Sequence, residues 1–152
     1  GKSAYKFLES TEDLSNYAYL LSRVQISKKS PSRFSELHSA RGNYTVFAPT
    51  NEALQTFLDS VYNTKNFDIT QTEDIIADFI VRNSIIDNGE SNAYLSTQFN
   101  VGTLDKANMN DRYLQVSFDN DTVTGKATII INNKSRLFSE DNEVSNGYVL
   151  TP

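Results

Sequence analysis

Apolar side chains recur with helical spacing near the start of the chain, at intervals of three and four residues. The positions are Leu14, Tyr17, Ala18, Leu21 and Val24. Ser10 and Asp13 form a capping-box pattern just before them, a pair that satisfies free amides at a helix start. The pattern therefore predicts a helix over about residues 13–26 that begins at this box.

The following segment, SKKSPSRFSELHSARGN, is polar and contains Pro31 and Gly42. Both residue types interrupt regular structure. We expect a surface connection here, with one helical turn at Phe34–His38.

The stretch YTVFAPTNEALQTFL, residues 44–58, joins a predicted strand to a predicted helix. Pro49 ends the strand because proline has no N–H for a ladder hydrogen bond. Thr50 follows as a typical N-cap, whose hydroxyl accepts from the first-turn amides. The apolar face of the helix comprises Leu54, Phe57, Leu58 and Val61. Since aromatic side chains commonly fill cores, we expect to find three there: Tyr44, Phe47 and Phe57.

A further helix is predicted after a second capping-box pattern, from Thr70 to Glu73. The segment EDIIADFIVRNSII places four side chains on one helical face, namely Ile76, Phe79, Ile80 and Asn83. We therefore expect this face to pack inward.

The second half of the chain changes to the period of two that is typical of strands. RYLQVSF alternates Leu114, Val116 and Phe118 on one face, and KATIIINN supplies a partner for a hairpin. Asn146-Gly147 is typical of a tight turn that introduces a last strand. Helices first and strands later indicate an α+β fold.

Composition narrows the class of protein. The 152 residues, 38% of them hydrophobic, suit a single domain over 1–152 that buries one core. A net charge of −5 disfavours nucleic acid and anionic lipid as partners. No apolar run reaches the roughly 20 residues of a membrane-spanning helix, so we expect membrane association only through an anchor outside this chain. With no cysteine, the redox compartment stays open.

Two motifs resemble those of the fasciclin domain family. YTVFAPTNEAL, residues 44–54, resembles the first signature, and NGYVL, residues 146–150, resembles the start of the second. In this resemblance Thr50 and Asn51 match the capping pair of the first motif. Asn146 and Gly147 match the turn of the second.

The resemblance implies a compact α+β domain, a β-wedge of about seven strands packed with several α-helices. It also implies a non-enzymatic adhesion or binding module of secreted or surface-anchored proteins. Arg82-Asn83 stands where the family has Tyr-His, so integrin contact through that region does not transfer. Leu150 occupies a position where the second motif of the family usually has a histidine. The second motif also stops early, which favours either a fragment cut from a longer surface protein or a divergent terminus.

Candidate chemistry is sparse. His38 is the single histidine, and without cysteine any triad or zinc site would depend on it alone. Asp119 and Asp121 begin like a calcium loop, but Val123 and Ile130 occupy ligand positions. The acidic run at Ser139–Glu143 is typical of solvated surface. We expect no catalytic residues, metal or cofactor.

Two hypotheses for function stand ahead of a third, an enzyme, for which the sequence supplies no pair of nucleophile and base. The first is an adhesion or ligand-binding module at the cell surface or outside the cell, with an extracellular protein as partner. The second is a glycan-capturing accessory protein of a bacterial carbohydrate-uptake system, displayed as an outer-membrane lipoprotein. Sugar rings stack on tyrosines in such sites, and the candidates for ligand contact are Tyr62, Tyr94 and Tyr148.

Overall fold

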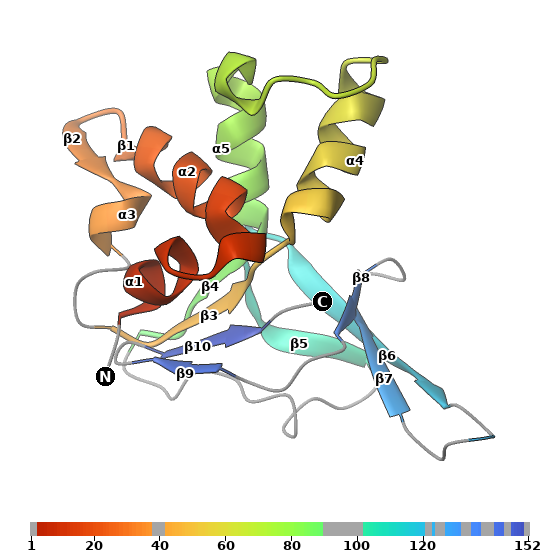
Figure 1. Cartoon of the computed structure of the whole chain (residues 1–152). Coiled ribbons are helices and arrows are strands. Elements are labelled where there is room, and N and C mark those ends of the chain that lie inside the picture. The colour runs from red at the N-terminus through yellow and green to blue at the C-terminus, as the bar shows by residue number, and fades with distance from the viewer. Residues whose placement is uncertain are drawn as a thin grey trace.

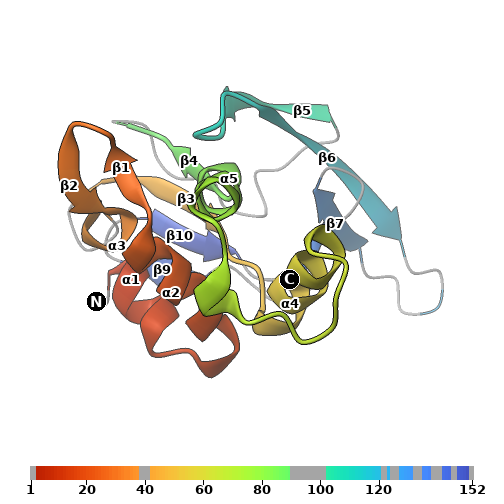
Figure 2. The ribbon, with the colours of Figure 1, turned by 90° about the horizontal axis from the view of Figure 1, so that it is seen from above.

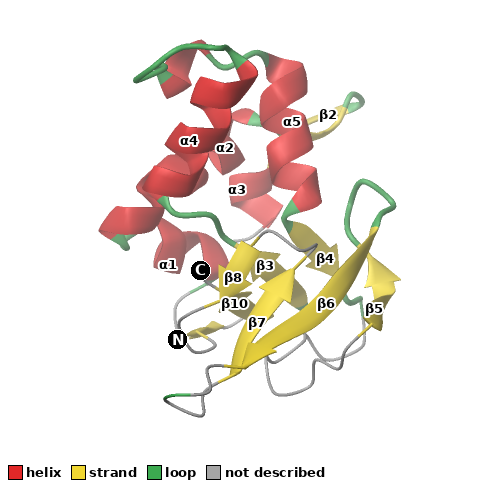
Figure 3. Ribbon diagram, turned by 90° about the vertical axis from the view of Figure 1, so that its right-hand side faces the viewer, coloured by secondary structure: helices red, strands yellow, loops and turns green. Residues whose placement is uncertain are grey.

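The computed structural model describes residues 3–37, 42–89, 102–120, 123, 127–131, 135–137, 142–144 and 147–150. Its helices gather on one side and its larger sheets on the other (Figures 1 and 3). The helices are α1 (Ala4–Glu9), α2 (Ser15–Arg23), α3 (Phe34–Leu37), α4 (Asn51–Val61) and α5 (Asp74–Asn83), with 3₁₀ turns η1 (Glu12–Leu14) and η2 (Ile69–Gln71). The architecture is α+β, as the sequence predicts.

The strands of the described residues form three sheets. A hairpin pairs β1 (Gln25–Ser27) with β2 (Ser30–Arg33). A mixed sheet has the order β4-β3-β10-β9, with β3 at Tyr44–Phe47, β4 at Ile85–Asp87, β9 at Asn142–Val144 and β10 at Gly147–Leu150. An antiparallel sheet has the order β5-β6-β7-β8, with bounds Gly102–Ala107, Tyr113–Asn120, Ala127–Ile131 and Ser135–Leu137. The described residues contain ten strands, so the expected number of about seven is not confirmed.

The predicted hairpin in the second half is confirmed. β6 and β7 are antiparallel, with Val116 opposite Ile131 and Asn120 opposite Ala127. Leu114 of β6 is buried, as its place in the alternation requires.

The main core lies where α1, α2, α4 and α5 meet the β3–β4 pair. Viewed from above, α5 stands between α2 and α4 over the mixed sheet (Figure 2). The largest fully buried side chains come from several of these elements: Leu8, Tyr17, Leu20, Leu21, Phe34, Val46, Leu58, Val81, Ile85 and Ile86. The predicted apolar face of the first helix is buried in full.

The predicted boundaries of that first helix are wrong at both ends. Ser10 ends α1 instead of starting a helix, because its hydroxyl donates to Phe7 O at 3.2 Å. The helical run then passes through η1 into α2, whose N-cap makes no side-chain hydrogen bond. It stops at Arg23, since Val24 adopts an extended backbone that leads into β1.

The second predicted capping box is also wrong. The Thr70 hydroxyl and amide both donate to Asp68 Oδ1, at 2.7 and 2.9 Å, and so complete η2. Helix α5 begins four residues later at Asp74, without a side-chain cap from Glu73. Thr70 is therefore hydrogen-bonded to Asp68 and does not provide the cap of α5 that the sequence pattern predicts.

In α4 and α5, the buried face differs from the apolar face that the sequence predicts. Helix α4 packs mainly against α2 and η1, so the Leu54–Leu58 row is buried while Phe57 and Val61 stay exposed. In α5 the buried row is Ala77, Ile80 and Val81. Phe79 is 49% exposed, which contradicts its assignment to the inner face.

The segment predicted as a surface connection contains more structure than expected. It forms the β1–β2 hairpin, with Pro31 inside β2, and then α3. Proline is tolerated there because β2 is an edge strand. Phe34 at the start of α3 is fully buried, so the connection is partly core.

Candidate functional site

The joint between β3 and α4 has the geometry that its sequence predicts. Val46 is fully buried and Phe47 half-buried. Thr50 has an extended backbone, and its Oγ1 accepts from the Ala53 amide at 3.1 Å. The predicted N-cap is therefore confirmed.

Asn51 has a role that the sequence did not reveal. Its Oδ1 accepts from the Asn16 amide at 2.9 Å, in the uncapped first turn of α2. Its Nδ2 donates to Glu12 O at 3.0 Å and to Ser15 Oγ at 3.1 Å. One residue at the start of α4 therefore supplies the cap that α2 lacks in its own sequence.

The two motifs that resemble the fasciclin signatures lie side by side. Strand β10 runs parallel to β3, with Gly147 opposite Tyr44 and Leu150 opposite Phe47. Gly147 also faces Val144 of β9 across a two-residue connection, as a tight turn requires. Asn146 belongs to that connection and lies outside the described residues.

The remaining predicted site residues do not come together in one place within the described residues. Tyr62 stacks on Phe67 with ring centroids 3.9 Å apart, and its hydroxyl accepts from the Glu73 amide at 3.0 Å. Tyr148 contributes its backbone to β10, whereas Tyr94 and His38 lie outside the described residues. Ligand contact by the three tyrosines stays a prediction.

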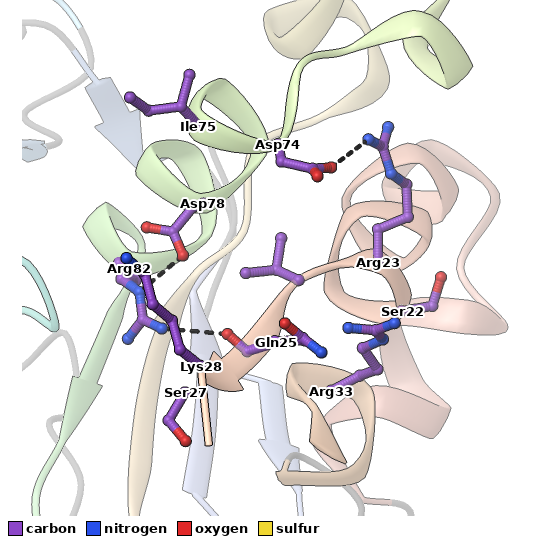
Figure 4. Close-up of a pocket in the computed structure, with 11 residues that line it drawn as sticks. Ser22, Arg23, Gln25, Ser27, Lys28, Arg33, Asp74, Ile75, Asp78 and Arg82 are labelled. Atoms are coloured by element: carbon purple, nitrogen blue, oxygen red, sulfur yellow. Dashed lines mark hydrogen bonds and ion pairs between the residues drawn. The ribbon is translucent and has the colours of Figure 1, made fainter. Parts of the chain in front are cut away.

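A cleft of about 930 Å³ opens on another part of the surface, within the range of roughly 300–1,000 Å³ that is typical of ligand sites. We call it the α5–hairpin cleft, because its walls are the end of α2, the β1–β2 hairpin and one side of α5 (Figure 4). Its described lining comprises residues 22–25, 27, 28 and 33 together with Asp74, Ile75, Asp78 and Arg82.

Arg82 ties the two walls of this cleft together. Its Nη2 donates to Ile26 O at 2.7 Å and to Gln25 O at 3.1 Å, and its Nε donates to Asp78 Oδ1 at 3.0 Å. Its guanidinium also lies over the Phe34 ring, 5.1 Å from the centroid. The guanidinium of Arg82 is therefore engaged in contacts that hold the hairpin against α5.

Arg23 is held in a similar way at the end of the cleft near the start of α5. Its Nη2 donates to Thr72 O at 2.7 Å and to Asp74 Oδ1 at 3.2 Å. The Asp74 side chain is fully exposed, so this ion pair contributes little stability. The carbonyl contact at Thr72 instead fixes the arginine against the segment before α5.

Lys28 and Arg33 are the two cations of the cleft whose side chains have no hydrogen bond or ion pair to any described residue. Arg33 is opposite Gln25 in the hairpin register, and the two side chains lie together in the cleft (Figure 4). Lys28 is exposed in the hairpin turn, and Arg33 is half-buried. Four basic side chains against two acidic ones leave the described lining positive by two, in a chain whose net charge is −5.

The described lining of the cleft is made of charged, uncharged polar and aliphatic side chains. The described lining offers two hydroxyls, from Ser22 and Ser27, without a histidine beside them. Ser22 Oγ already donates to Tyr19 O at 2.6 Å. The described residues also hold no group of three or more His, Cys, Asp or Glu side chains placed to bind a metal ion.

Sequence reasoning overlooked this cleft, although a signal exists. Four of the 14 basic residues lie within residues 23–33, and no acidic residue occurs between Asp13 and Glu36. In an acidic chain, such a local excess of positive charge indicates a binding surface. The partner wall on α5 is more than 40 residues away in sequence, so only the fold brings the two together.

Comparison with known proteins places the chain in a family. A family model described as the fasciclin domain matches residues 13–151. A solved structure, described as a FAS1 domain pair from the insect cell adhesion molecule Fasciclin I, is similar with a TM-score of 0.65 and 18% identity. The match covers 99% of this chain and 49% of that chain, so this chain spans about half the length of its structural neighbour. No match is found among curated proteins.

Fasciclin domains are typically extracellular or cell-surface adhesion modules and are generally non-enzymatic. None of the described helices combines the length and the hydropathy needed to cross a membrane. Since the family model spans nearly the whole sequence and the solved structure shares the fold, the chain belongs to the fasciclin domain family.

Proposed function

We propose that this chain is a non-enzymatic adhesion module that holds an extracellular partner in the α5–hairpin cleft. The observation that carries the proposal is the pair of cations, Lys28 and Arg33, that face the cleft without a partner among the described residues. Charges left free in a concave site provide attraction and specificity for a partner of opposite charge.

The structural role of Arg82 also supports this location. In the resemblance to the family, Arg82-Asn83 replaces the Tyr-His pair, and Arg82 is only 21% exposed. Its contacts to Gln25 O and Ile26 O fix the hairpin, which makes the cleft a preformed surface. A preformed site loses little conformational entropy when a partner binds.

The proposal is tested with beads that carry the chain and are mixed with cells of the organism that encodes it. The test variant is Lys28→Gln/Arg33→Gln, and the matched control is Lys6→Gln/Lys65→Gln, which removes two exposed cations outside the described cleft lining. We expect beads with the unmodified chain and the control to bind cells and beads with the test variant to lose binding.

Two results would contradict the proposal. Adhesion that is equal for the test variant and the control would place the contact elsewhere. Turnover of an ester, amide or glycoside by the chain would contradict the non-enzymatic assignment. Secretion or display as a bacterial lipoprotein stays a prediction, which fractionation of cells that express the precursor would test.

A further inference from the structure

We infer that the α5–hairpin cleft recognises an acidic peptide segment of a partner protein. This inference rests on the proposed function and names the chemical class of its partner. It starts from the charges of the cleft, which are not distributed evenly.

The two aspartates of the lining are already compensated. Asp78 pairs with Arg82 at 3.0 Å and Asp74 with Arg23 at 3.2 Å, so these pairs contribute little net field. The remaining charge belongs to Lys28 and Arg33, which come from the turn and the end of one hairpin. Both therefore project from a single short element that Arg82 fixes in place.

Long polyanions are poor candidates for the ligand that binds Lys28 and Arg33. Screening limits surface electrostatics to about 8 Å at physiological ionic strength, so a short acidic segment senses the local excess of two positive charges. A nucleic acid or a long sulfated polymer would extend over the rest of a chain with net charge −5 and be repelled.

Apolar surface in the cleft favours a peptide over a sugar. Val24 and Ile75 are the aliphatic residues of the described lining; Val24 is buried in the core, whereas Ile75 is 75% exposed and supplies the apolar surface. The described lining contains no aromatic ring on which a sugar could stack. A peptide that alternates carboxylate and aliphatic side chains matches both features, with its carboxylates at Arg33 and Lys28 and an aliphatic side chain against Ile75.

The experiment is an NMR titration of the ¹⁵N-labelled chain with a short capped peptide of alternating glutamate and leucine. We expect amide shifts in the β1–β2 hairpin, at the end of α2 and in α5, and weaker binding as salt is raised. Lys28→Gln/Arg33→Gln should weaken binding roughly tenfold, since each ion pair at the surface contributes about a factor of three. Lys6→Gln/Lys65→Gln should leave the affinity unchanged.

Two further ligands make the result specific. An otherwise identical peptide with glutamine in place of glutamate should not shift the cleft amides, and a sulfated heparin disaccharide should shift them less than the acidic peptide. Equal binding of the glutamine peptide would overturn the inference, and so would stronger binding of the disaccharide or unmoved cleft amides.

The bead assay separates failure of the inference from failure of the proposed function. If the acidic peptide does not bind but cell adhesion still requires Lys28 and Arg33, the cleft is the site and its partner has another chemistry. If adhesion is unchanged when both cations are replaced, the proposed function fails as well. Thermal unfolding of each variant shows whether it is folded, which we expect because neither side chain has a described partner.

Discussion

A single carboxylate organises the loop that follows α4. Asp59 Oδ1 accepts from the Phe67 amide and from Gln55 Nε2, both at 2.8 Å, and Oδ2 accepts from the Asn66 amide at 3.1 Å. Asn66 is held at a positive φ of 55°, a conformation that asparagine tolerates better than most residues. The loop therefore depends on Asp59 being ionised.

The pKa of Asp59 predicts how stability depends on acid. The Phe67 amide is the main cause that lowers this pKa below its ordinary value of 3.8, followed by Gln55. A lowered pKa means that the ionised carboxylate stabilises the folded chain above that value, and that this contribution is lost as pH falls through the folded-state pKa. We expect Asp59→Asn to show a flatter loss of stability than the unmodified chain between about pH 5 and 2, measured as urea midpoints.

The control for this measurement is Asp13→Asn, another exposed carboxylate. It removes one negative charge from the surface outside the Asp59 loop, and its urea midpoints are compared with those of Asp59→Asn at each pH. Parallel limbs for Asp59→Asn and the unmodified chain would show that the loop does not depend on this charge.

At the level of elements, the start of α4 is a junction for two helices. Thr50 caps α4 itself, and Asn51 caps the first turn of α2. Tyr17 of α2 in turn makes a buried hydrogen bond with Ser84, just after α5, and burial raises the pKa of Tyr17 far above its ordinary range. Three helices are therefore coupled through a few polar contacts around one core.

Substitutions at this junction should have distinguishable effects. Thr50→Ala should lower the free energy of unfolding by about 1 kcal/mol through loss of one cap. Asn51→Ala should lower it by about 2 kcal/mol, because three hydrogen bonds between elements are lost. Urea denaturation measures both, with the exposed Thr56→Ala in the same helix as control; an Asn51→Ala midpoint equal to the control would contradict the capping role.

The sequence predicted the elements better than their ends. Tyr44–Phe47 and the Thr50 cap were predictable because Pro49 and the helical period act locally. The two false capping boxes show the limit of the approach, since Ser10 and Thr70 fit the pattern while neighbouring groups use their hydroxyls. The cap that α2 does have comes from Asn51, 35 residues away from Asn16, and no local pattern reports such a contact.

For the whole molecule, the parallel pairing of β10 with β3 joins two segments that are far apart in the sequence. β3 is flanked by β4 on one side and β10 on the other, and its Val46 is fully buried in the core. The α5–hairpin cleft was not predicted for a related reason, because its two walls are distant in sequence. Charge composition could have indicated the hairpin wall, but not the α5 wall.

Ending the chain after Val144 tests the importance of this pairing. Without β10, the backbone of β3 loses its hydrogen-bond partners on one side, from Tyr44 to Phe47, and keeps those on the side of β4. We expect a loss of at least about 3 kcal/mol, since each ladder hydrogen bond contributes about 1 kcal/mol net. Circular dichroism during urea unfolding measures it, and a midpoint unchanged from the full chain would show that β10 is dispensable.

The β3–β10 pairing also sets the order of events in folding. The paired residues are about 100 positions apart in the sequence, so the contact requires closure of a very long loop, and such contacts slow folding. During synthesis, β3 leaves the ribosome about 100 residues before its partner and presents an open edge until β10 has been made. We therefore expect a nascent chain to depend on chaperones that shield an exposed strand until β10 has been translated.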